Sequence, residues 1–328
     1  MKIAVIGSGS WGCAISILLA NKGNNVYLWS WQQEETDRLN ADRENKLVLP
    51  GKPFPDNITC SHDMAECVKD ASLIVTVAPS PATRATAKQL GAVVADGQVV
   101  VNLSKGLEES TLMTLSQVYK EEIPQAKIAV MSGPSHAEEV SIGLPTTNVV
   151  AAEDIETAEY IQEIFMNNVF RVYTGTDMLG VELGGALKNV IALCSGISDG
   201  MGYGDNTRAA LITRGLAEIT RLGVKMGAKP ETFSGLSGIG DLIVTCTSVH
   251  SRNHRAGILL GKGKPLAETL DEVKMVVEGV NTAKAAYLLS QQYEVAMPII
   301  TEAYNIVFGG KNPQDAVNEL MTRNKKSE

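Results

Sequence analysis

The chain has 328 residues, of which 44% are hydrophobic and 20% are charged, and its formal net charge is −8. This composition is typical of a water-soluble globular protein with length for about two domains, and the acidic balance argues against broad electrostatic attraction to nucleic acid or anionic membranes. Five cysteines are scattered without a CxxC pattern, and the first strand-like run begins at Lys2, leaving no room for a secretory signal before it. We therefore expect reduced thiols in a cytoplasmic protein.

The first half of the chain alternates short apolar runs, rich in β-branched residues, with helical stretches such as 11–23. Continuous apolar runs are typical of parallel strands buried on both faces, and their alternation with helices predicts a parallel sheet with right-handed crossovers. Two later runs are expected to extend this sheet. The expected strands cover 3–7, 25–29, 72–77, 99–104, 127–132, 144–153 and 170–175.

The pattern changes near Gly180, after which long helical stretches follow one another and no convincing pair of strands appears beyond Tyr173. This change predicts an α/β fold with two domains. We expect a mostly parallel sheet domain at 1–178 and an all-helical domain at 179–328, joined near 176–180.

A glycine-rich turn directly follows the first expected strand. Gly7, Gly9 and Gly12 form GSGSWG where that strand passes into a helix. Glycines with this spacing permit a tight turn and a close approach of the backbone to a pyrophosphate, which sits on the helix N-terminus. A GxGxxG match alone is weak, but its position between a strand and a helix favours dinucleotide binding.

The residue that distinguishes NAD from NADP is missing from the end of the second expected strand. An acid there would bind the ribose of NAD and an arginine would bind the extra phosphate of NADP, but Trp31 and Gln32 stand at this position. Two roles are open for Trp31, which are stacking on the adenine and packing against a neighbouring helix. The expected cofactor is NAD or NADP, and the missing arginine favours NADH.

Three further loops are expected at the carboxyl edge of the sheet, where open α/β folds bind ligands. Lys105 in the second loop can reach an anion or a carbonyl oxygen, although a solvated loop lysine is the commoner role. In the third loop Gly133 sets a sharp turn, and Ser135 with Glu138 matches the S-x-x-E pattern of a capping box. The loops cover 78–84, 102–109 and 132–139.

Lys188 lies in an apolar helical stretch of the second half, with the small residues Gly184 and Gly185 one turn before it. A lysine in this pattern is unusual for a surface, and partial desolvation would disfavour its charged form and favour proton exchange near neutral pH. The alternative is a lysine at the helix edge whose ammonium group snorkels to solvent.

A polar segment at 238–257 contains Asp241 and a basic group near Arg252. Ser251, Arg252 and Asn253 precede the helical stretch RAGILLG, so free backbone N–H groups and a guanidinium form a candidate phosphate site. The alternative is a capped helix that follows a surface loop.

The histidines do not predict a metal site. His250 and His254 are four residues apart and could share a helix face, but a third ligand and the HExxH motif are missing. We expect His62 and His136 to have structural or loop roles and Cys246 to pack in the core or a wall.

Taken together, these segments resemble the NAD(P)-dependent glycerol-3-phosphate dehydrogenases of the bacterial biosynthetic type. The resemblance covers essentially the whole chain in family order, and it implies a Rossmann domain, a helical domain and a substrate cleft between them. It also implies reversible reduction of dihydroxyacetone phosphate to sn-glycerol 3-phosphate for glycerophospholipid synthesis. The matching segments are GSGSWG, NLSKGLE, SGPSHAEEV, GVELGGALKN, GYGDNTRAALITRGLAE, FSGLSGIGDLIVTC, SRNHRAG and VVEGVNTA.

The resemblance implies roles for individual residues. Lys188 matches the proton donor and acceptor at the substrate C2 oxygen, and Lys105 and Asp241 match its neighbours at the reacting end. Further implied substrate contacts are Gly133 and Ser135, together with a phosphate clamp formed by Ser251, Arg252 and Asn253. The expected cofactor contacts are Gly7, Gly9, Ser10, Trp11, Gly12, Trp31, Lys105, Ala137, Arg252, Val276 and Glu278.

The chain departs from the family at Trp31 and Gln32, where many members carry His or Arg, and this leaves the choice between NADH and NADPH open.

Two alternative functions remain. A β-hydroxyacid dehydrogenase has a similar two-domain plan, but it places Asn four residues after the lysine, where this chain has Ala192. An NAD(H)-sensing module without catalysis would not need the lysines and the aspartate.

The expected partners follow from the charge and from the resemblance. We expect a small-molecule substrate, no nucleic acid, no membrane insertion and, because members of the family often form dimers, a homodimer.

Overall fold

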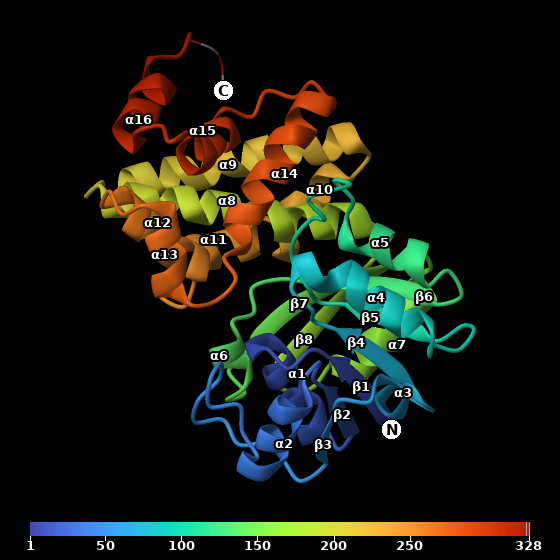
Figure 1. Cartoon of the computed structure of the whole chain (residues 1–328). Helices are drawn as coiled ribbons and strands as arrows, with labels where there is room; N and C mark the ends of the chain where they lie inside the picture. The colour runs from blue at the N-terminus through green and yellow to red at the C-terminus, as the bar shows by residue number, and fades with distance from the viewer. Residues whose placement is uncertain (326, 328) are drawn as a thin grey trace. The chain divides into compact units, whose positions relative to one another are not determined.

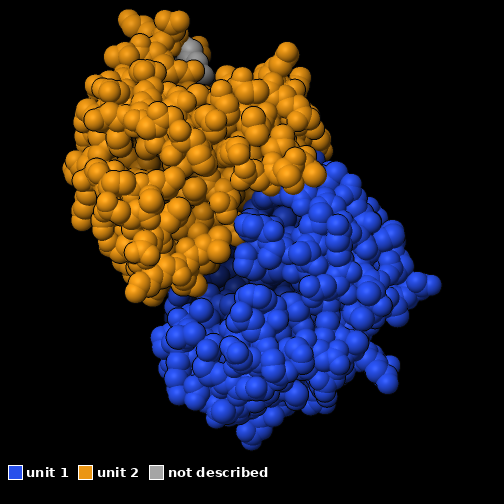
Figure 2. Space-filling view, viewed as in Figure 1, with its two compact units in different colours: residues 1–108, 113–182 blue, residues 109–112, 183–328 orange. Residues whose placement is uncertain are grey.

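The computed structural model describes residues 1–325 and 327 and divides into two compact units (Figures 1 and 2). Unit 1, blue in Figure 2, contains residues 1–108 and 113–182. Unit 2, orange in Figure 2, contains residues 109–112 and 183–328.

Within the described residues, eight strands form one sheet in unit 1, in the order β3-β2-β1-β4-β5-β6-β7-β8. All neighbouring strands are parallel except β6 and β7, which confirms the predicted mostly parallel sheet. The strands are β1 Lys2–Ile6, β2 Asn25–Trp29, β3 Ile58–Ser61, β4 Leu73–Thr76, β5 Val99–Asn102, β6 Lys127–Ser132, β7 Thr146–Ala152 and β8 Phe170–Gly175.

The predicted strands are all present, but the sequence pattern misses β3. This short strand pairs only with β2 and lies at the edge of the sheet. Its four residues include the exposed Thr59 and do not form the continuous apolar run of a central strand.

Two apolar layers cover the two faces of the sheet. On β1, Ile3 and Val5 join one cluster together with residues of α1, whereas Ala4 and Ile6 join a second cluster together with residues of α3 and α4. All four strand residues are fully buried, which explains the uninterrupted apolar run. The helices of unit 1 are α1 Ser10–Asn21, α2 Gln33–Asp42, α3 Met64–Val68, α4 Thr83–Gly91, α5 Leu115–Glu122, α6 Ala137–Val140 and α7 Ile155–Phe165, with a 3-10 turn at Ser80–Ala82.

The candidate ligand loops lie at one edge of the sheet, as predicted. Strands β1, β4, β5 and β6 are parallel neighbours, so their carboxyl ends meet at the same edge. The glycine turn follows β1 there, and loops 78–84, 102–109 and 132–139 follow the other three strands.

Beyond β8 the described residues contain helices and no strand, which confirms the predicted helical second half. Helix α8 begins in unit 1 and continues through unit 2. By length and composition it could cross a bilayer, but 89% of its most apolar window is buried inside the protein, as in a core helix. The helices are α8 Met178–Gly200, α9 Asp205–Met226, α10 Pro230–Phe233, α11 Asp241–Thr247, α12 Arg252–Gly261, α13 Leu266–Val273, α14 Glu278–Gln292, α15 Pro298–Gly309 and α16 Pro313–Thr322, with a π-helical turn at Leu236–Gly240.

The five cysteines are free thiols, and Cys194 alone among them is half-buried rather than buried. Burial raises the pKa of Cys13, Cys60, Cys67 and Cys246 to about 12 and also raises that of Cys194. Cys246 is fully buried, which confirms its expected packing role.

Candidate functional site

The three glycines of the first turn meet three different steric demands. Gly7 adopts a φ of +123°, which side-chain-bearing residues rarely adopt. A Cβ at Gly12 would overlap the carbonyl oxygen of Gly7, whereas a Cβ at Gly9 would meet open space. Gly12 therefore lets α1 pack against the turn, and Gly9 leaves the approach to the helix N-terminus clear.

The N-terminus of α1 offers hydrogen-bond donors to an anion. Gly9 is the N-cap, no side chain caps the helix, and its first turn contains no acidic residue. Ser10 and Trp11, both half-buried, stand in this turn. Free N–H groups and the positive end of the helix dipole fit the pyrophosphate of a dinucleotide.

Trp31 is 71% exposed, and both of its possible roles, stacking on the adenine and packing against a neighbouring helix, stay predictions. The sequence analysis missed an acid close by. Oε2 of Glu35, in the first turn of α2, accepts hydrogen bonds from the hydroxyl groups of Ser8, at 2.8 Å, and Ser30. Glu35 lies five residues beyond Ser30, so inspection of the strand end alone did not find it.

The structure brings Lys105, Gly133 and Ser135 together at the edge of the sheet. The Lys105 ammonium and the Ser135 hydroxyl each donate to the Gly133 carbonyl oxygen at 2.9 Å. The capping-box interpretation is wrong, because the N-cap of α6 is His136 and no side chain caps that helix. Ser135 turns to the Gly133 carbonyl instead, and Ala137 begins α6, which packs against α1.

Lys188 in unit 2 is only 5% exposed, so the snorkelling alternative is wrong. Its Nζ donates to Oδ1 of Asp241 at 2.5 Å and to Oγ1 of Thr245 at 2.6 Å. Asp241 and Thr245 stand one turn apart on α11, and Asp241 is 1% exposed. The sequence analysis missed Thr245, although its i,i+4 spacing from Asp241 is a usable signal.

A close contact between α8 and the π-helical turn places Asp241 beside Lys188. A Cβ at Gly184 would overlap the carbonyl oxygen of Ser237, so the glycine lets this turn lie directly on α8. Gly184 precedes Lys188 by one helical turn, and Asp241 begins α11 directly after the π-helical turn.

The start of α12 carries the predicted phosphate clamp. Ser251 is the N-cap, and its hydroxyl oxygen accepts from the His254 N–H at 3.2 Å. The hydroxyl retains its own proton to donate. The half-buried Arg252 donates through Nη1 to the Val276 carbonyl oxygen at 3.2 Å. The segment is therefore both a capped helix and a cationic helix start.

Asn253 joins the clamp to the lysine helix and to the segment that carries Val276 and Glu278. Its Nδ2 donates to Oδ1 of Asn189 at 2.9 Å, and its Oδ1 accepts from the Gly279 N–H at 2.8 Å. Asn189 adjoins Lys188, and Gly279 adjoins Glu278 at the start of α14. Three predicted segments of unit 2 thus converge, whereas the glycine turn, Lys105 and Gly133 belong to unit 1.

His250 and His254 do not share a helix face, because α12 begins at Arg252. His254 instead contacts Oδ2 of Asp199 through Nε2 at 2.8 Å. Among the residues that the structure describes, no group of three or more His, Cys, Asp or Glu side chains could hold a metal ion.

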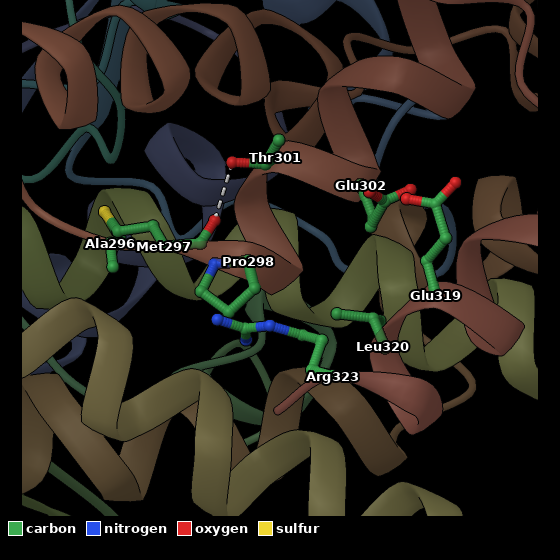
Figure 3. A pocket seen from close by; sticks show the side chains of 8 residues that line it. All are labelled: Ala296, Met297, Pro298, Thr301, Glu302, Glu319, Leu320 and Arg323. Carbon is green, nitrogen blue, oxygen red and sulfur yellow. Dashed lines mark hydrogen bonds between the residues drawn. The ribbon is translucent and has the colours of Figure 1, made fainter. Parts of the chain in front are cut away.

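Two cavities of unit 2 lie away from the lysine cluster. The smaller, of about 310 Å³, is drawn in Figure 3, where Pro298, Glu302 and Arg323 are among its lining side chains. The larger, of about 970 Å³, shares these three residues and also reaches Glu218. Neither of these two cavities is lined by a predicted site residue.

The sequence matches two halves of one family. Residues 2–158 match the NAD-dependent glycerol-3-phosphate dehydrogenase N-terminus, and residues 177–318 match the C-terminus of the same family. A glycerol-3-phosphate dehydrogenase (NAD(P)+) of Moorella thermoacetica is 56% identical over 322 residues, covering 98% of this chain and 96% of the relative. Its counterpart in Agathobacter rectalis is 54% identical over 327 residues, covering 100% of this chain and 97% of the relative.

Solved structures match over the same length. A glycerol-3-phosphate dehydrogenase of Coxiella burnetii has a TM-score of 0.95 and 37% identity, covering 98% of this chain and 99% of that one. The enzyme of the same name from Saccharomyces cerevisiae has a TM-score of 0.84 and 27% identity, covering 97% of this chain and 98% of that one.

Proposed function

Because the chain belongs to the NAD-dependent glycerol-3-phosphate dehydrogenase family, we propose that it transfers hydride reversibly between a nicotinamide dinucleotide and dihydroxyacetone phosphate. Reduction gives sn-glycerol 3-phosphate. The observation that carries this proposal is the buried Lys188–Asp241 pair, at 2.5 Å, in the same unit as the cationic start of α12. The Lys188–Asp241 pair would act at the reacting carbonyl, and the start of α12 would bind the remote phosphate.

Lys188 is the proposed acid and base. When the ketone is reduced at C2, negative charge develops on the C2 oxygen, and the Lys188 ammonium donates a proton to that oxygen. In the reverse direction the neutral amine takes the proton from the C2 hydroxyl. Lys188 Nζ donates hydrogen bonds of 2.5 and 2.6 Å to Asp241 and Thr245, so these residues orient the amine before the reaction begins.

Ser251, Arg252 and Asn253 are the proposed phosphate contacts. The substrate phosphate is remote from C2, and its binding energy can orient a small ketone for reaction. The Ser251 hydroxyl, the Arg252 guanidinium and the N–H groups of the first turn of α12 supply donors of the required kind. Asn253 already bonds Asn189, beside Lys188, and this bond couples the two ends of the proposed substrate site within unit 2.

Lys105, Gly133 and Ser135 are proposed as substrate contacts contributed by unit 1. This assignment is supported by the motifs NLSKGLE and SGPSHAEEV and by the two hydrogen bonds that join Lys105 and Ser135 to the Gly133 carbonyl. A second ammonium near the C2 oxygen would add to the stabilisation of its charge.

The cofactor is NAD or NADP, and when bound it supplies or accepts the hydride. Gly7, Gly9, Gly12, Ser10 and Trp11 would hold its pyrophosphate, which fits the open space at Gly9 and the uncapped N-terminus of α1. We favour NADH because the Glu35 carboxylate stands beside Ser8 in this turn, where its charge would repel the extra phosphate of NADP. Further proposed cofactor contacts are Trp31, Lys105, Ala137, Arg252, Val276 and Glu278.

The wider assignments follow from the family. We infer that residues 1–178 bind the dinucleotide and that 179–328 bind the substrate. The proposed role is supply of glycerol 3-phosphate for glycerophospholipid synthesis by a cytoplasmic homodimer that neither binds nucleic acid nor inserts into a membrane.

Loss of reduced-nicotinamide absorbance after addition of dihydroxyacetone phosphate tests the function, with NADH and NADPH in parallel. We expect consumption with both cofactors and the faster rate with NADH. A 3-oxo acid of similar size, the oxidised form of a β-hydroxyacid, serves as the control substrate. Folded protein that binds cofactor but consumes none with the phosphorylated ketone would overturn the assignment. Turnover of the keto acid would then indicate a hydroxyacid dehydrogenase, and its absence would indicate a sensing module.

A further inference from the structure

Helices α8 and α12 touch through their backbones. A Cβ at Gly196 of α8 would overlap the His254 carbonyl oxygen, and a Cβ at Gly257 of α12 would overlap the Leu193 carbonyl oxygen. Farther along both helices, a Cβ at Gly200 or Gly261 would overlap a backbone carbonyl of the partner helix in the same way. This glycine seam fixes the separation of the two helices, and apolar side chains of both helices, such as Ile197 and Leu260, pack beside it in one cluster.

Two directional polar contacts flank the seam and can fix the angle at which α12 lies on α8. Asn253 bonds Asn189, seven residues before Gly196, and His254 bonds Asp199, three residues after it. At 1.5 Å per residue these anchors lie about 10 Å and about 5 Å from Gly196 along α8, on opposite sides of it. The first turn of α12 is therefore held at two points of one helix.

Asp199 is itself held in place. Its carboxylate accepts two hydrogen bonds from the Arg208 guanidinium of α9, at 3.0 and 2.9 Å, in addition to the contact with His254 Nε2 at 2.8 Å. Because Arg208 balances the charge of Asp199, replacing His254 does not leave an isolated carboxylate. His254 is 8% exposed, so the contact is shielded from water.

We propose that the Asp199–His254 contact sets the angle of the first turn of α12, and with it the placement of the phosphate contacts Arg252 and Asn253 relative to Lys188. His254 is a positioning residue, which acts through α12 rather than through contact with substrate. The inference rests on the proposed function. It makes the Asp199–His254 contact a determinant of how tightly the enzyme binds a substrate whose phosphate and carbonyl are separated as in dihydroxyacetone phosphate.

The test compares His254→Leu with His254→Gln in the full-length enzyme. Leucine cannot bond Asp199, whereas the glutamine amide can donate to it in place of the imidazole. We expect His254→Leu to raise the KM for dihydroxyacetone phosphate about 10-fold with a smaller change in kcat, because a hydrogen bond to a charged group is lost. His254→Gln should return KM to within about 2-fold of the wild type, since it restores that bond.

Asp205→Asn is the matched control, because Asp205 is the other partner of Arg208, at 2.7 Å, and its side chain is 94% exposed. It should leave KM unchanged. If the leucine variant does not fold, His254→Asn takes its place, since its amide is too short to reach Asp199 and should raise KM in the same way.

Three results would overturn the inference: an unchanged KM, a fall in kcat alone, and a glutamine variant as impaired as the variant that cannot bond Asp199. A wild-type enzyme that fails to reduce dihydroxyacetone phosphate would instead overturn the proposed function.

Discussion

The glycine turn of unit 1 and the lysine cluster of unit 2, formed by Lys188, Asp241 and Thr245, offer different kinds of groups to a ligand. The turn presents backbone, because Gly9 is exposed and no side chain caps α1. The cluster presents side chains, because Lys188 and Asp241 are 5% and 1% exposed and bond each other. At the turn the harmful change is an added methyl group, whereas in the cluster it is a lost functional group.

This difference also separates what each region contributes. Backbone donors recognise a phosphate without reference to pH, since an amide N–H does not titrate in the physiological range. Buried ionisable side chains can move a proton, but each needs a partner to offset its desolvation. Substitutions in the glycine turn should therefore weaken cofactor binding, whereas substitutions in the lysine cluster should lower turnover.

Lys188→Ala tests the side-chain region and has the largest expected effect. We expect kcat to fall about 1,000-fold or more, because the proton donor and its charge are lost together. Cofactor binding, measured by fluorescence titration, should survive because the glycine turn lies in the other unit. Lys284→Ala, at an exposed lysine paired with Glu109, should leave kcat unchanged. Near-normal turnover in Lys188→Ala would remove Lys188 from its role.

Arg252→Ala addresses binding rather than chemistry. Loss of a charge-assisted contact to phosphate should raise the KM for dihydroxyacetone phosphate by roughly 10- to 100-fold. Steady-state kinetics with Arg255→Ala provides the control, because Arg255 stands three residues farther along α12 and is exposed. Equal effects of the two substitutions would contradict a specific clamp and indicate a general role of positive charge.

Gly12→Ala and Gly9→Ala separate packing from ligand access at the turn. The Gly12 methyl group would overlap the Gly7 carbonyl, and we expect the free energy of unfolding to fall by about 1–3 kcal/mol. The Gly9 methyl group meets open space, so stability should change by less than about 0.5 kcal/mol while cofactor binding weakens. Denaturant unfolding and cofactor titration distinguish the two effects, and tight cofactor binding by Gly9→Ala would contradict the assigned role.

Glu218→Gln gives the smallest expected effect, visible in the pH dependence of stability. Glu218 accepts hydrogen bonds from the N–H groups of Ile299, at 2.9 Å, and Ile300, at 3.2 Å, at the start of α15, and burial raises its pKa to about 7 from an ordinary value of 4.5. The folded state therefore binds the proton more tightly than the unfolded state. The resulting stabilisation is complete below pH 4.5 and is lost as the pH rises through about 7.

From pH 6 to pH 8 this group should reduce the free energy of unfolding by about 1 kcal/mol. Urea unfolding of the wild type and Glu218→Gln at several pH values measures the difference. Glutamine keeps an amide oxygen that can accept from α15 but does not titrate, so the slope due to Glu218 should vanish. An identical slope in both proteins would rule out this titration.

The fold follows from local patterns to the extent that each element is locally distinctive. Central strands such as β1 and β5 are continuous apolar runs because both faces are covered. The edge strand β3 has no such run and is missed. The S-x-x-E match at Ser135 fails because the N-cap of α6 is His136, one residue later, and this shift of the helix start is not visible in spacing.

The candidate site is predictable only where its parts are local. The glycine turn lies within six residues and is recognised by its spacing together with its position between a strand and a helix. Lys188 and Asp241 are 53 residues apart, and Asn189 and Asn253 are 64 apart. Their pairing depends on how α8, α11 and α12 pack. The local pattern could therefore mark Lys188 as unusual, but only the resemblance to a family placed it beside Asp241.

The buried cysteines have a practical consequence for labelling. Alkylating reagents attack the thiolate, and burial raises the pKa of all five thiols, including the half-buried Cys194, so we expect them to react slowly in the folded protein at neutral pH. We therefore expect little background labelling of the native chain by maleimides. A cysteine introduced at the exposed position of Trp31 would carry a single fluorophore beside the glycine turn, with every natural cysteine left in place.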